Sequence, residues 1–371
     1  MKTRKISGTV KRSLQINLAL FVLSILLCFI GLEIVTRIPK TDPDGQAYFF
    51  GKQLRPYKLP VNSLMRAIDS YNESSYIMYD NLLGWKVRPL SESSNGKYKA
   101  NSLGLRGPEP LGNKKVIAIF GDSFIHGDDV YYHESLAYYL QEMMPEYEVM
   151  NYGVPGYGFD QAYLRYLEIA SKTNPDIVIV GFQPENCLRN MNIIRSFYQR
   201  GTMIPFTKPR FFDGKLVNYP TVEISKITET VASFSGSELS RYEYFYNQED
   251  YQEKWYLNSR AIAVLDAYIH PKRTPIFGGE TEKLCLDIAR KFDNSVFLHI
   301  PAKEYLMQKK LGSYPYETML STLSREHIVI DPTEALLDED FSSLYVGHFS
   351  GKGNKILAES VVKYLSNRTK V

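Results

Sequence analysis

The succession of apolar runs and amphipathic segments from residue 114 onward most constrains what this chain can fold into. Strands are predicted for the short apolar runs, at 114–120, 147–151, 176–182, 294–301 and 326–331. Helices are predicted where apolar residues recur three and four apart, at 135–144, 159–173, 281–292 and 353–365. The run DIVIVGF at 176–182 is apolar at almost every position, as in strands covered on both faces. We therefore expect an α/β fold, a three-layer α/β/α sandwich with a mainly parallel sheet.

The N-terminus predicts a membrane anchor. From Ser13 to Leu32 the chain has 20 consecutive residues without a charge. At about 1.5 Å rise per residue, a helix of this length covers the roughly 30 Å hydrocarbon core of a bilayer. Five basic residues precede the run and three follow it within twenty residues, Lys2, Arg4, Lys5, Lys11 and Arg12 against Arg37, Lys40 and Lys52. This bias places the N-terminus in the cytoplasm and the chain after about residue 36 outside.

Two other interpretations of this segment are a cleaved signal peptide and a lipoprotein signal. The apolar run is longer than the core of a usual signal peptide, and no small-x-small cleavage triplet follows it. Cys28 follows Leu26 and Leu27, without the small residue expected before a lipidated Cys. We expect an uncleaved single-pass anchor in the cell membrane. Cys187 and Cys285 would then face an oxidising compartment, although nothing in the sequence shows that they meet.

Composition excludes several classes of protein. Of 371 residues, 44% are hydrophobic and 23% charged, which is ordinary for a globular protein and excludes wholesale disorder. Residues 1–40 have a net charge of +6 within a total of +3, so the rest of the chain is slightly acidic and no nucleic-acid partner is expected. The three Cys have no metal-ligand spacing, and we expect neither a metal nor a cofactor.

Three regions follow from these patterns. Residues 1–40 form a cytoplasmic tail and transmembrane anchor, 41–110 a polar lead-in without strong helical periodicity, and 111–371 the α/β domain, with an insertion at about 190–278. Within the insertion, Asp213-Gly214 between apolar runs predicts a β-hairpin turn. An aromatic-rich stretch at 242–256 is expected to be buried against the main domain, the alternative being a stacking surface for sugar rings.

Residues able to do chemistry follow the predicted strands. In an open α/β sheet, ligands bind beyond the carboxyl ends of the strands. Those positions hold Gly121-Asp122-Ser123, Gly153-Val154-Pro155-Gly156, the segment 181–190 and, after the last strand, Gly347-His348. A Ser at a strand-to-helix turn can attack an acyl carbon while a His accepts its proton. Backbone N–H groups and an Asn amide nearby would stabilise the oxyanion, each donor contributing roughly 10²–10³ in rate.

At these positions the chain resembles the SGNH (GDSL-like) hydrolases, over about residues 79–371. Four blocks occur in order, GDSF at 121–124, NYGVPGYG at 151–158, GFQPENC at 181–187 and GHFSGKGN at 347–354. The resemblance implies the flavodoxin-like SGNH fold, Ser123 as nucleophile and His348 as base. It also implies an oxyanion hole from Ser123, Gly153 and Asn186. YDNLLGW at 79–85 and NSLGLRGPE at 101–109 look like the lead-in of membrane-anchored bacterial members.

Two positions depart from the family pattern. The last block usually has an Asp three residues before the His, where this chain has Tyr345. The third block is normally Gly-x-Asn-Asp, but this chain has Pro184-Glu185-Asn186-Cys187. His348 must therefore be oriented by another group, for which a backbone carbonyl or Asp340 is a candidate. Losing the acid of a Ser-His-Asp triad costs about 10⁴ in rate, so the chain is either a Ser-His dyad enzyme, which we favour, or a weakened relative.

Other candidate residues are given structural roles. A polar cluster after the nucleophile, His126, Asp128, Asp129 and His133, has no standard metal spacing and is interpreted as solvated loop charge. His299 is expected to be a packed core histidine. Asp331 is expected to cap the helix that follows it.

The expected function is a membrane-anchored extracytoplasmic serine esterase that removes O-acyl groups, with cell-surface carbohydrate suggested as substrate by the location and the resemblance. Two alternatives stay open. The same acyl-enzyme could pass its acyl group to a polysaccharide hydroxyl, making the chain an O-acyltransferase. The substitutions at Tyr345 and in the third block instead motivate a catalytically silent glycan-binding or scaffold module.

Overall fold

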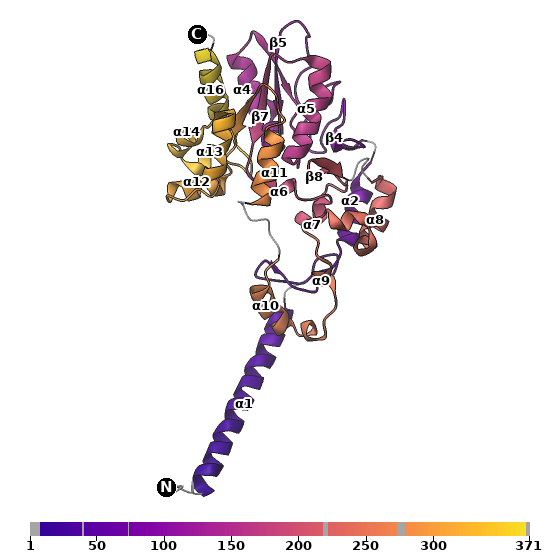
Figure 1. Ribbon diagram of the computed structural model, residues 1–371, viewed down its shortest axis with the longest axis vertical. Coiled ribbons are helices and arrows are strands. Elements are labelled where there is room, and N and C mark those ends of the chain that lie inside the picture. Colours follow the sequence, from indigo (N-terminus) through magenta and orange to yellow (C-terminus); the bar gives the residue numbers. More distant parts are fainter. Residues whose placement is uncertain (1–7, 39–40, 73, 218–221, 273–278, 369–371) are drawn as a thin grey trace. The chain divides into compact units, whose positions relative to one another are not determined.

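The computed structural model describes residues 8–38, 41–72, 74–217, 222–272 and 279–368 (Figure 1). The chain divides into two compact units, residues 1–62 with 246–273 (the small unit) and 63–245 with 274–371 (the sheet unit). These boundaries differ from the predicted ones, since the lead-in 41–110 and the insertion 190–278 are each shared between both units. Lys2, Arg4, Lys5 and Lys40, which contribute to the predicted membrane orientation, lie outside the described residues.

The sheet unit is built on one five-stranded, fully parallel sheet, as predicted. Its strands are β5 (Lys115–Phe120), β6 (Tyr147–Asn151), β7 (Ile177–Phe182), β10 (Ser295–His299) and β11 (Ile328–Ile330). They lie in the order β11-β10-β7-β5-β6. The chain adds β6 on one side of β5 and then returns to add β7 on the other, so the switch point of this flavodoxin-like order lies between β5 and β7. A ligand site is expected at the carboxyl end of β5.

Helices cover both faces of the sheet (Figure 1), and alternate residues of the strands belong to two different cores. Ala118, Val180 and Phe297 lie in a core with α5 (Phe159–Thr173), α11 (Glu280–Ala289) and α13 (Glu317–Glu326). Ile119, Ile179 and Leu298 lie in the opposite core, whose helices are α4 (Leu136–Met143), α12 (Lys303–Lys310), α14 (Thr333–Leu337), α15 (Phe341–Leu344) and α16 (Gly351–Arg368). Covering both faces explains why the strands are apolar at nearly every position.

The predicted hairpin is confirmed. β8 (Arg210–Phe212) pairs antiparallel with β9 (Lys215–Val217) across Asp213 and Gly214. Both turn residues have positive φ, 46° and 73°, the geometry that two-residue hairpins prefer. The remaining short elements of the sheet unit are β3 (Ile77–Asp80), β4 (Gly84–Val87), α3 (Ser123–His126), η1 (Tyr132–Glu134), α6 (Glu185–Arg189), α7 (Arg195–Tyr198), α8 (Ile224–Ala232), η2 (Phe234–Gly236) and η3 (Glu238–Arg241).

The lead-in contains a helix that the sequence analysis did not predict. α2 (Val61–Ser70) begins directly after Pro60 and buries Leu64 and Ala67. Its apolar residues Val61, Leu64, Met65 and Ile68 recur three and four apart, which is helical spacing, so the prediction of a lead-in without strong helical periodicity is wrong here. Its start after a proline is a second signal that was available.

The small unit contains the apolar helix α1 (Gly8–Arg37), β1 (Tyr48–Phe49), β2 (Lys52–Gln53), α9 (Gln248–Tyr251), η4 (Trp255–Asn258) and α10 (Arg260–Ile269). Within α1, Gln15–Arg37 is long and apolar enough to cross a membrane, with a mean hydropathy of 2.8. Arg55 forms two hydrogen bonds to Asp266, at 2.7 and 2.6 Å, and one to Asp250 at 3.0 Å. These ion pairs join the lead-in to the end of the insertion.

The aromatic stretch is only partly buried. Phe245 and Tyr246 are buried, whereas Tyr242, Tyr244, Tyr251 and Tyr256 are half-buried. Phe245 belongs to the sheet unit, whereas Tyr246, Tyr251 and Tyr256 belong to the small unit. Trp255 is the exception, since 85% of its surface is exposed. The prediction that this stretch is buried is therefore wrong for Trp255.

Candidate active site

Ser123 lies just beyond the carboxyl end of β5, at the switch point of the sheet. β5 ends at Phe120, and Ser123 opens the short helix α3 two residues after Gly121. The Asp122 carboxylate accepts a hydrogen bond from the Phe124 N–H at 3.0 Å, which fixes the strand-to-helix turn. Ser123 is 6% exposed and lines a cleft of about 720 Å³.

His348 reaches the same cleft from the loop between α15 and α16. Its Nε2 lies 2.8 Å from Ser123 Oγ, although the two residues are 225 positions apart. The imidazole also packs edge-on against the Phe124 ring at 4.7 Å between centroids. The structure thus brings together the two residues on which the predicted chemistry depends.

Asp129, and not Asp340, orients His348. Asp129 Oδ2 lies 2.8 Å from His348 Nδ1 and also accepts the His348 backbone N–H at 3.1 Å. Partial burial raises the pKa of Asp129, but the hydrogen bonds from His348 outweigh it and lower the pKa. Asp340 instead caps α15 by accepting the Ser342 N–H at 3.2 Å. The suggestion that Asp340 folds back to His348 is therefore corrected, and a Ser-His-Asp arrangement replaces the expected dyad.

The position three residues before His348 is used for packing. Tyr345 is 7% exposed, stacks on Phe349 at 4.7 Å and donates its hydroxyl hydrogen bond to the Pro301 carbonyl at 2.9 Å. Because the acid arrives from the loop after α3, an aromatic residue at 345 does not leave the histidine without a partner.

Two backbone features hold the Asp129–His348 contact. Asp129 adopts a positive φ of 71°, which Asp tolerates better than most residues. Gly347 has a φ of 122°, and a Cβ on it would overlap with Asp129 Oδ2. Glycine at 347 is therefore required for the carboxylate to approach the His348 backbone.

Gly156, and not Gly153, lines the cleft. The Gly153 N–H donates to Asn151 Oδ1 at 2.9 Å, and a Cβ on Gly153 would overlap with the backbone of α3. Gly153 is therefore a close-packing residue behind Ser123, and its N–H is committed to Asn151, which contradicts its predicted place in the oxyanion hole. Gly156 lines the cleft together with Ser123 and His348. Among the described residues, no hydrogen-bond acceptor is found for the Gly156 N–H.

The peptide groups on both sides of Gly156 are held by the lead-in and by α7. Trp85 Nε1 donates to the Pro155 carbonyl at 2.9 Å, and Arg195 Nη1 donates to the Gly156 carbonyl at 2.8 Å. Tyr157 in turn donates its hydroxyl hydrogen bond to the Trp85 carbonyl at 2.6 Å. Trp85 belongs to the YDNLLGW motif, so this motif positions the loop that faces Ser123.

The third block presents Glu185 and Arg189 to the cleft. Burial raises the pKa of Glu185, but the Arg189 charge and the hydrogen bond from Tyr198 hold it below its usual range. Arg189 also donates a hydrogen bond to Asp122 Oδ2 at 3.1 Å. The Arg189 charge lowers the pKa of Asp122, but burial has the larger effect and the pKa is raised.

Asn186 is buried in α6, and its Oδ1 has no partner among the described residues. Asn186 is absent from the residues that line the cleft.

A disulfide fixes the helix that carries this block. Cys187 of α6 is bonded to Cys285 of α11, and both are fully buried. The bond closes a loop of 98 residues that includes most of the insertion. The sequence contained both cysteines but no indication that they pair.

His126, the last residue of α3, is fully buried. His126 Nδ1 lies 2.5 Å from Asp128 Oδ1, and its Nε2 lies 2.8 Å from the Tyr76 hydroxyl. Burial lowers the pKa of His126. His133 lies apart and stacks on Tyr131. The interpretation of this cluster as solvated loop charge is therefore wrong for His126, which packs, and for Asp129, which contacts His348.

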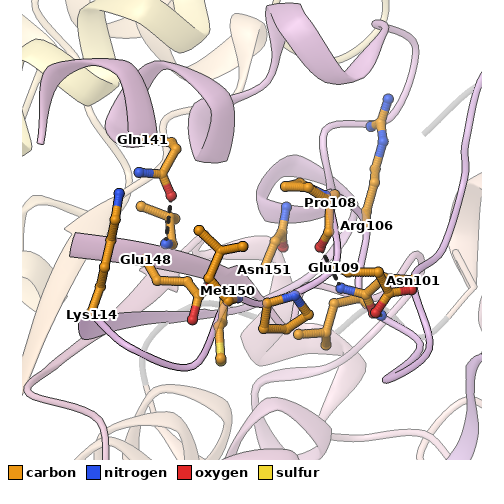
Figure 2. Close-up of a pocket in the computed structure, with 14 residues that line it drawn as sticks. Asn101, Arg106, Pro108, Glu109, Lys114, Gln141, Glu148, Met150 and Asn151 are labelled. Atoms are coloured by element: carbon orange, nitrogen blue, oxygen red, sulfur yellow. Dashed lines mark hydrogen bonds between the residues drawn. The ribbon is translucent and has the colours of Figure 1, made fainter. Parts of the chain in front are cut away.

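A second pocket, of about 280 Å³, lies where the lead-in meets β6 (Figure 2). Glu148 accepts the N–H groups of Leu111 and Gly112, the latter at 3.2 Å, and Gln141 Oε1 accepts the Val149 N–H at 3.0 Å. These polar groups satisfy one another along the edge of the sheet. The pocket shares no lining residue with the Ser123 cleft, and we assign it a structural role.

No model of a known protein family and no curated protein matches this sequence. Solved structures do match. A lipase/acylhydrolase from Enterococcus faecalis is 14% identical, over 68% of this chain and 96% of that chain, with a TM-score of 0.35. A member of the lipolytic protein G-D-S-L family from Veillonella parvula is 12% identical, over 68% and 98%, with a TM-score of 0.33. The chain is similar to these two proteins over about two thirds of its length.

Proposed function

We propose that this protein is a serine hydrolase that cleaves O-acyl esters through Ser123, His348 and Asp129. One observation carries the proposal, namely the continuous hydrogen-bonded series from Ser123 Oγ through the imidazole to Asp129 Oδ2, with both distances 2.8 Å. This is the order of nucleophile, base and orienting acid that acyl transfer to a serine requires. It also argues against the catalytically silent module.

In the first step Ser123 Oγ attacks the acyl carbonyl carbon while His348 Nε2 accepts the hydroxyl proton. The Asp129 carboxylate holds the Nδ1–H tautomer and stabilises the imidazolium that forms. The tetrahedral intermediate then expels the alcohol, which takes the proton from Nε2. Water, deprotonated by the same nitrogen, attacks the acyl-enzyme and releases the carboxylic acid and free Ser123.

The oxyanion would be bound by the backbone N–H groups of Ser123 and Gly156. Gly156 is favoured over Gly153 because it faces the cleft and its N–H is not committed to another acceptor among the described residues. Trp85 and Arg195 act as positioning residues for this donor. Asn186 remains a candidate third donor through its side-chain amide.

The site would work outside the cytoplasm, with residues 1–40 as tail and anchor. Two observations support this location. Helix α1 has the length and hydropathy of a single membrane span. The Cys187–Cys285 disulfide suits an oxidising compartment, because thiols are kept reduced in the cytosol.

Cell-surface carbohydrate esters are the proposed substrates. The walls of the cleft offer hydrogen-bonding groups suited to sugar hydroxyls, from Glu185, Arg189, Gln199 and Thr202. A cleft of about 720 Å³ is large enough for a sugar residue together with a short acyl group.

A fluorophosphonate probe tests the proposal on the full chain in detergent. The wild type should be labelled at Ser123, and labelling should be lost in S123A and H348A. Circular dichroism of each variant should match the wild type, so that loss of labelling reports chemistry and not unfolding. A folded wild-type protein that is not labelled and releases no acid from acetylated sugars would overturn the proposal.

A further inference from the structure

Within the small unit, the segment Trp255–Ala261 (the corner) is joined to the apolar helix α1 by hydrogen bonds that involve its last four residues. Glu33 of α1 accepts the Ser259 hydroxyl hydrogen bond at 2.7 Å, together with the backbone N–H groups of Arg260 at 3.0 Å and Ala261 at 2.9 Å. Arg37 Nη2 also donates to the Asn258 carbonyl at 3.1 Å. The first turn of α10 is therefore tied to the last turn of α1.

The depth of this corner relative to the bilayer follows from its position along α1. The uncharged run ends at Leu32, and Glu33 is the next residue. If a run of 20 residues fills the roughly 30 Å hydrocarbon core, Glu33 lies where the headgroup layer begins. Trp255 precedes Ser259 by four residues of mostly 3₁₀ helix, which at about 2 Å per residue puts it within roughly 8 Å of that level.

The outward position of Trp255 is held by its neighbours. Leu257 is 6% exposed and packs with Ala263 and Val264, and Tyr256 packs against the same cluster. The Trp255 ring contacts Tyr256 edge-on at 5.9 Å. The indole is therefore presented by a packed turn and not by a frayed chain end. Tryptophan is the residue most typical of the membrane–water interface, because its ring is apolar and its N–H is polar.

The charges around the corner suit anionic headgroups. The corner and its neighbours carry Lys254, Arg260 and Arg37 against Glu253 and Glu33, which leaves one positive charge in excess, and Glu33 pairs with Arg37. Burial and the nearby Arg37 charge lower the pKa of Arg260, which indicates that these two cations lie close together. Lipid phosphates would balance this surplus of positive charge.

We propose that the corner Trp255–Ala261 lies in the headgroup layer of the bilayer that α1 crosses, with the Trp255 indole inserted at the interface. The inference rests on the proposed anchor, and it adds a second contact with the membrane. It also gives the one exposed residue of the aromatic stretch a partner other than a sugar ring.

The chain contains two tryptophans, and Trp85 is 1% exposed, so fluorescence can isolate Trp255. Full-length wild type and W255F are reconstituted into phosphatidylcholine–phosphatidylglycerol vesicles with or without dibrominated lipid. The difference between the two spectra reports Trp255. In vesicles its emission should lie at shorter wavelength than that of a fully water-exposed indole, and it should be quenched by the brominated lipid but not by iodide. The W255F spectrum, which reports Trp85, should be insensitive to both quenchers.

Flotation of the vesicles separates this inference from the anchor. If the wild type does not float with the vesicles, the anchor itself is wrong. If it floats and Trp255 is quenched by iodide but not by brominated lipid, the anchor holds and the interfacial contact is overturned. If Trp255 is shielded from both quenchers, it is covered by protein, and a second copy of the chain replaces the bilayer as its partner.

Discussion

Two of the histidine–aspartate pairs near the carboxyl edge of the sheet, His348–Asp129 and His299–Asp331, differ in the group that the second ring nitrogen contacts. His348 pairs with Asp129 at 2.8 Å and turns Nε2 toward Ser123 in an open cleft. His299, the last residue of β10, pairs with Asp331 at 2.9 Å and turns Nε2 toward the Tyr314 hydroxyl at 2.7 Å. His299 is fully buried, whereas the His348 side chain is 27% exposed.

The chemistry of a site therefore depends on access and on the third group, and not on the pair itself. In the buried pair, His299 of β10 bonds to Asp331 after β11 and to Tyr314 in the loop before α13, so it connects these three segments. In the exposed pair, the second ring nitrogen of His348 contacts Ser123 in the cleft, where a proton can pass to and from a substrate. The predictions below test this difference, beginning with the largest effect.

Replacing Asp129 should have the largest effect on activity. D129N keeps the shape of the side chain but removes the charge that stabilises the imidazolium, so the rate of probe labelling should fall by about 10⁴-fold. D340N is the matched control, because Asp340 caps α15 and its loss should leave labelling within about twofold of wild type, as expected for an exposed surface change. Equal losses in both variants would contradict the assignment.

Gly347 should be nearly as sensitive as the triad. In G347A the new methyl group overlaps with Asp129 Oδ2, and the positive φ is strained. The carboxylate and His348 should separate by about 1 Å, which lowers the labelling rate about 10²-fold. G312A is the control, since Gly312 has a φ of 85° but nothing within 4 Å of the new Cβ. Labelling of G347A at the wild-type rate would contradict this prediction, because the Asp129–His348 contact would then tolerate a methyl group at position 347.

Replacing the buried pair should change stability but not labelling. H299A leaves Asp331 and the Tyr314 hydroxyl without their partner, which should lower the free energy of unfolding by about 1–3 kcal/mol. The labelling rate of the folded fraction should stay at the wild-type value. Urea denaturation followed by circular dichroism, with labelling measured on the same samples, checks both statements. A large loss of labelling with unchanged stability would mean that His299 also serves the reaction.

Trp85 should affect the reaction through the oxyanion donor. W85F removes the indole N–H that holds the Pro155 carbonyl, so the Gly156 N–H loses part of its alignment. We expect a loss of about tenfold in kcat for an acetyl ester with KM nearly unchanged, since misalignment acts on the transition state more than on ground-state binding. A rise in KM at constant kcat would instead assign Trp85 to substrate binding.

The smallest effect is a pH dependence of stability. Burial raises the pKa of Asp331, but the hydrogen bonds from His299 and Thr333 outweigh it and lower the pKa from 3.8 to about 2. A depressed pKa contributes stability above pH 4 that is lost as the pH falls toward 2. Wild type should therefore lose more stability than D331N between pH 4 and pH 2 in acid titrations followed by fluorescence. Equal losses of stability in the two proteins would show that Asp331 does not cause this pH dependence.

Much of the fold follows from the sequence because strands buried on both faces leave a strong pattern. All five predicted sheet strands, the four predicted helices and the Asp213–Gly214 hairpin are present within a few residues of their expected bounds. α2 was missed although Val61, Leu64, Met65 and Ile68 have helical spacing, because this short segment lies within a polar, proline-containing lead-in. The pairing of Cys187 with Cys285 was not predictable, because two cysteines 98 residues apart carry no information about distance in space.

For the candidate site, the amino-acid sequence was enough to select Ser123 and His348 as the proposed nucleophile and base. Ser123 directly follows a strand that ends at the ligand-binding edge of the sheet, and the four blocks that resemble the SGNH pattern pointed to His348 in the loop before the last helix. The tertiary structure alone decided the groups around them. Asp129 was taken for a loop charge, and Gly153 was chosen over Gly156, because backbone conformation at Gly347 and packing behind α3 determine which of two neighbouring residues faces the cleft. Such choices depend on atoms brought together from distant parts of the chain, and periodicity and spacing do not record them.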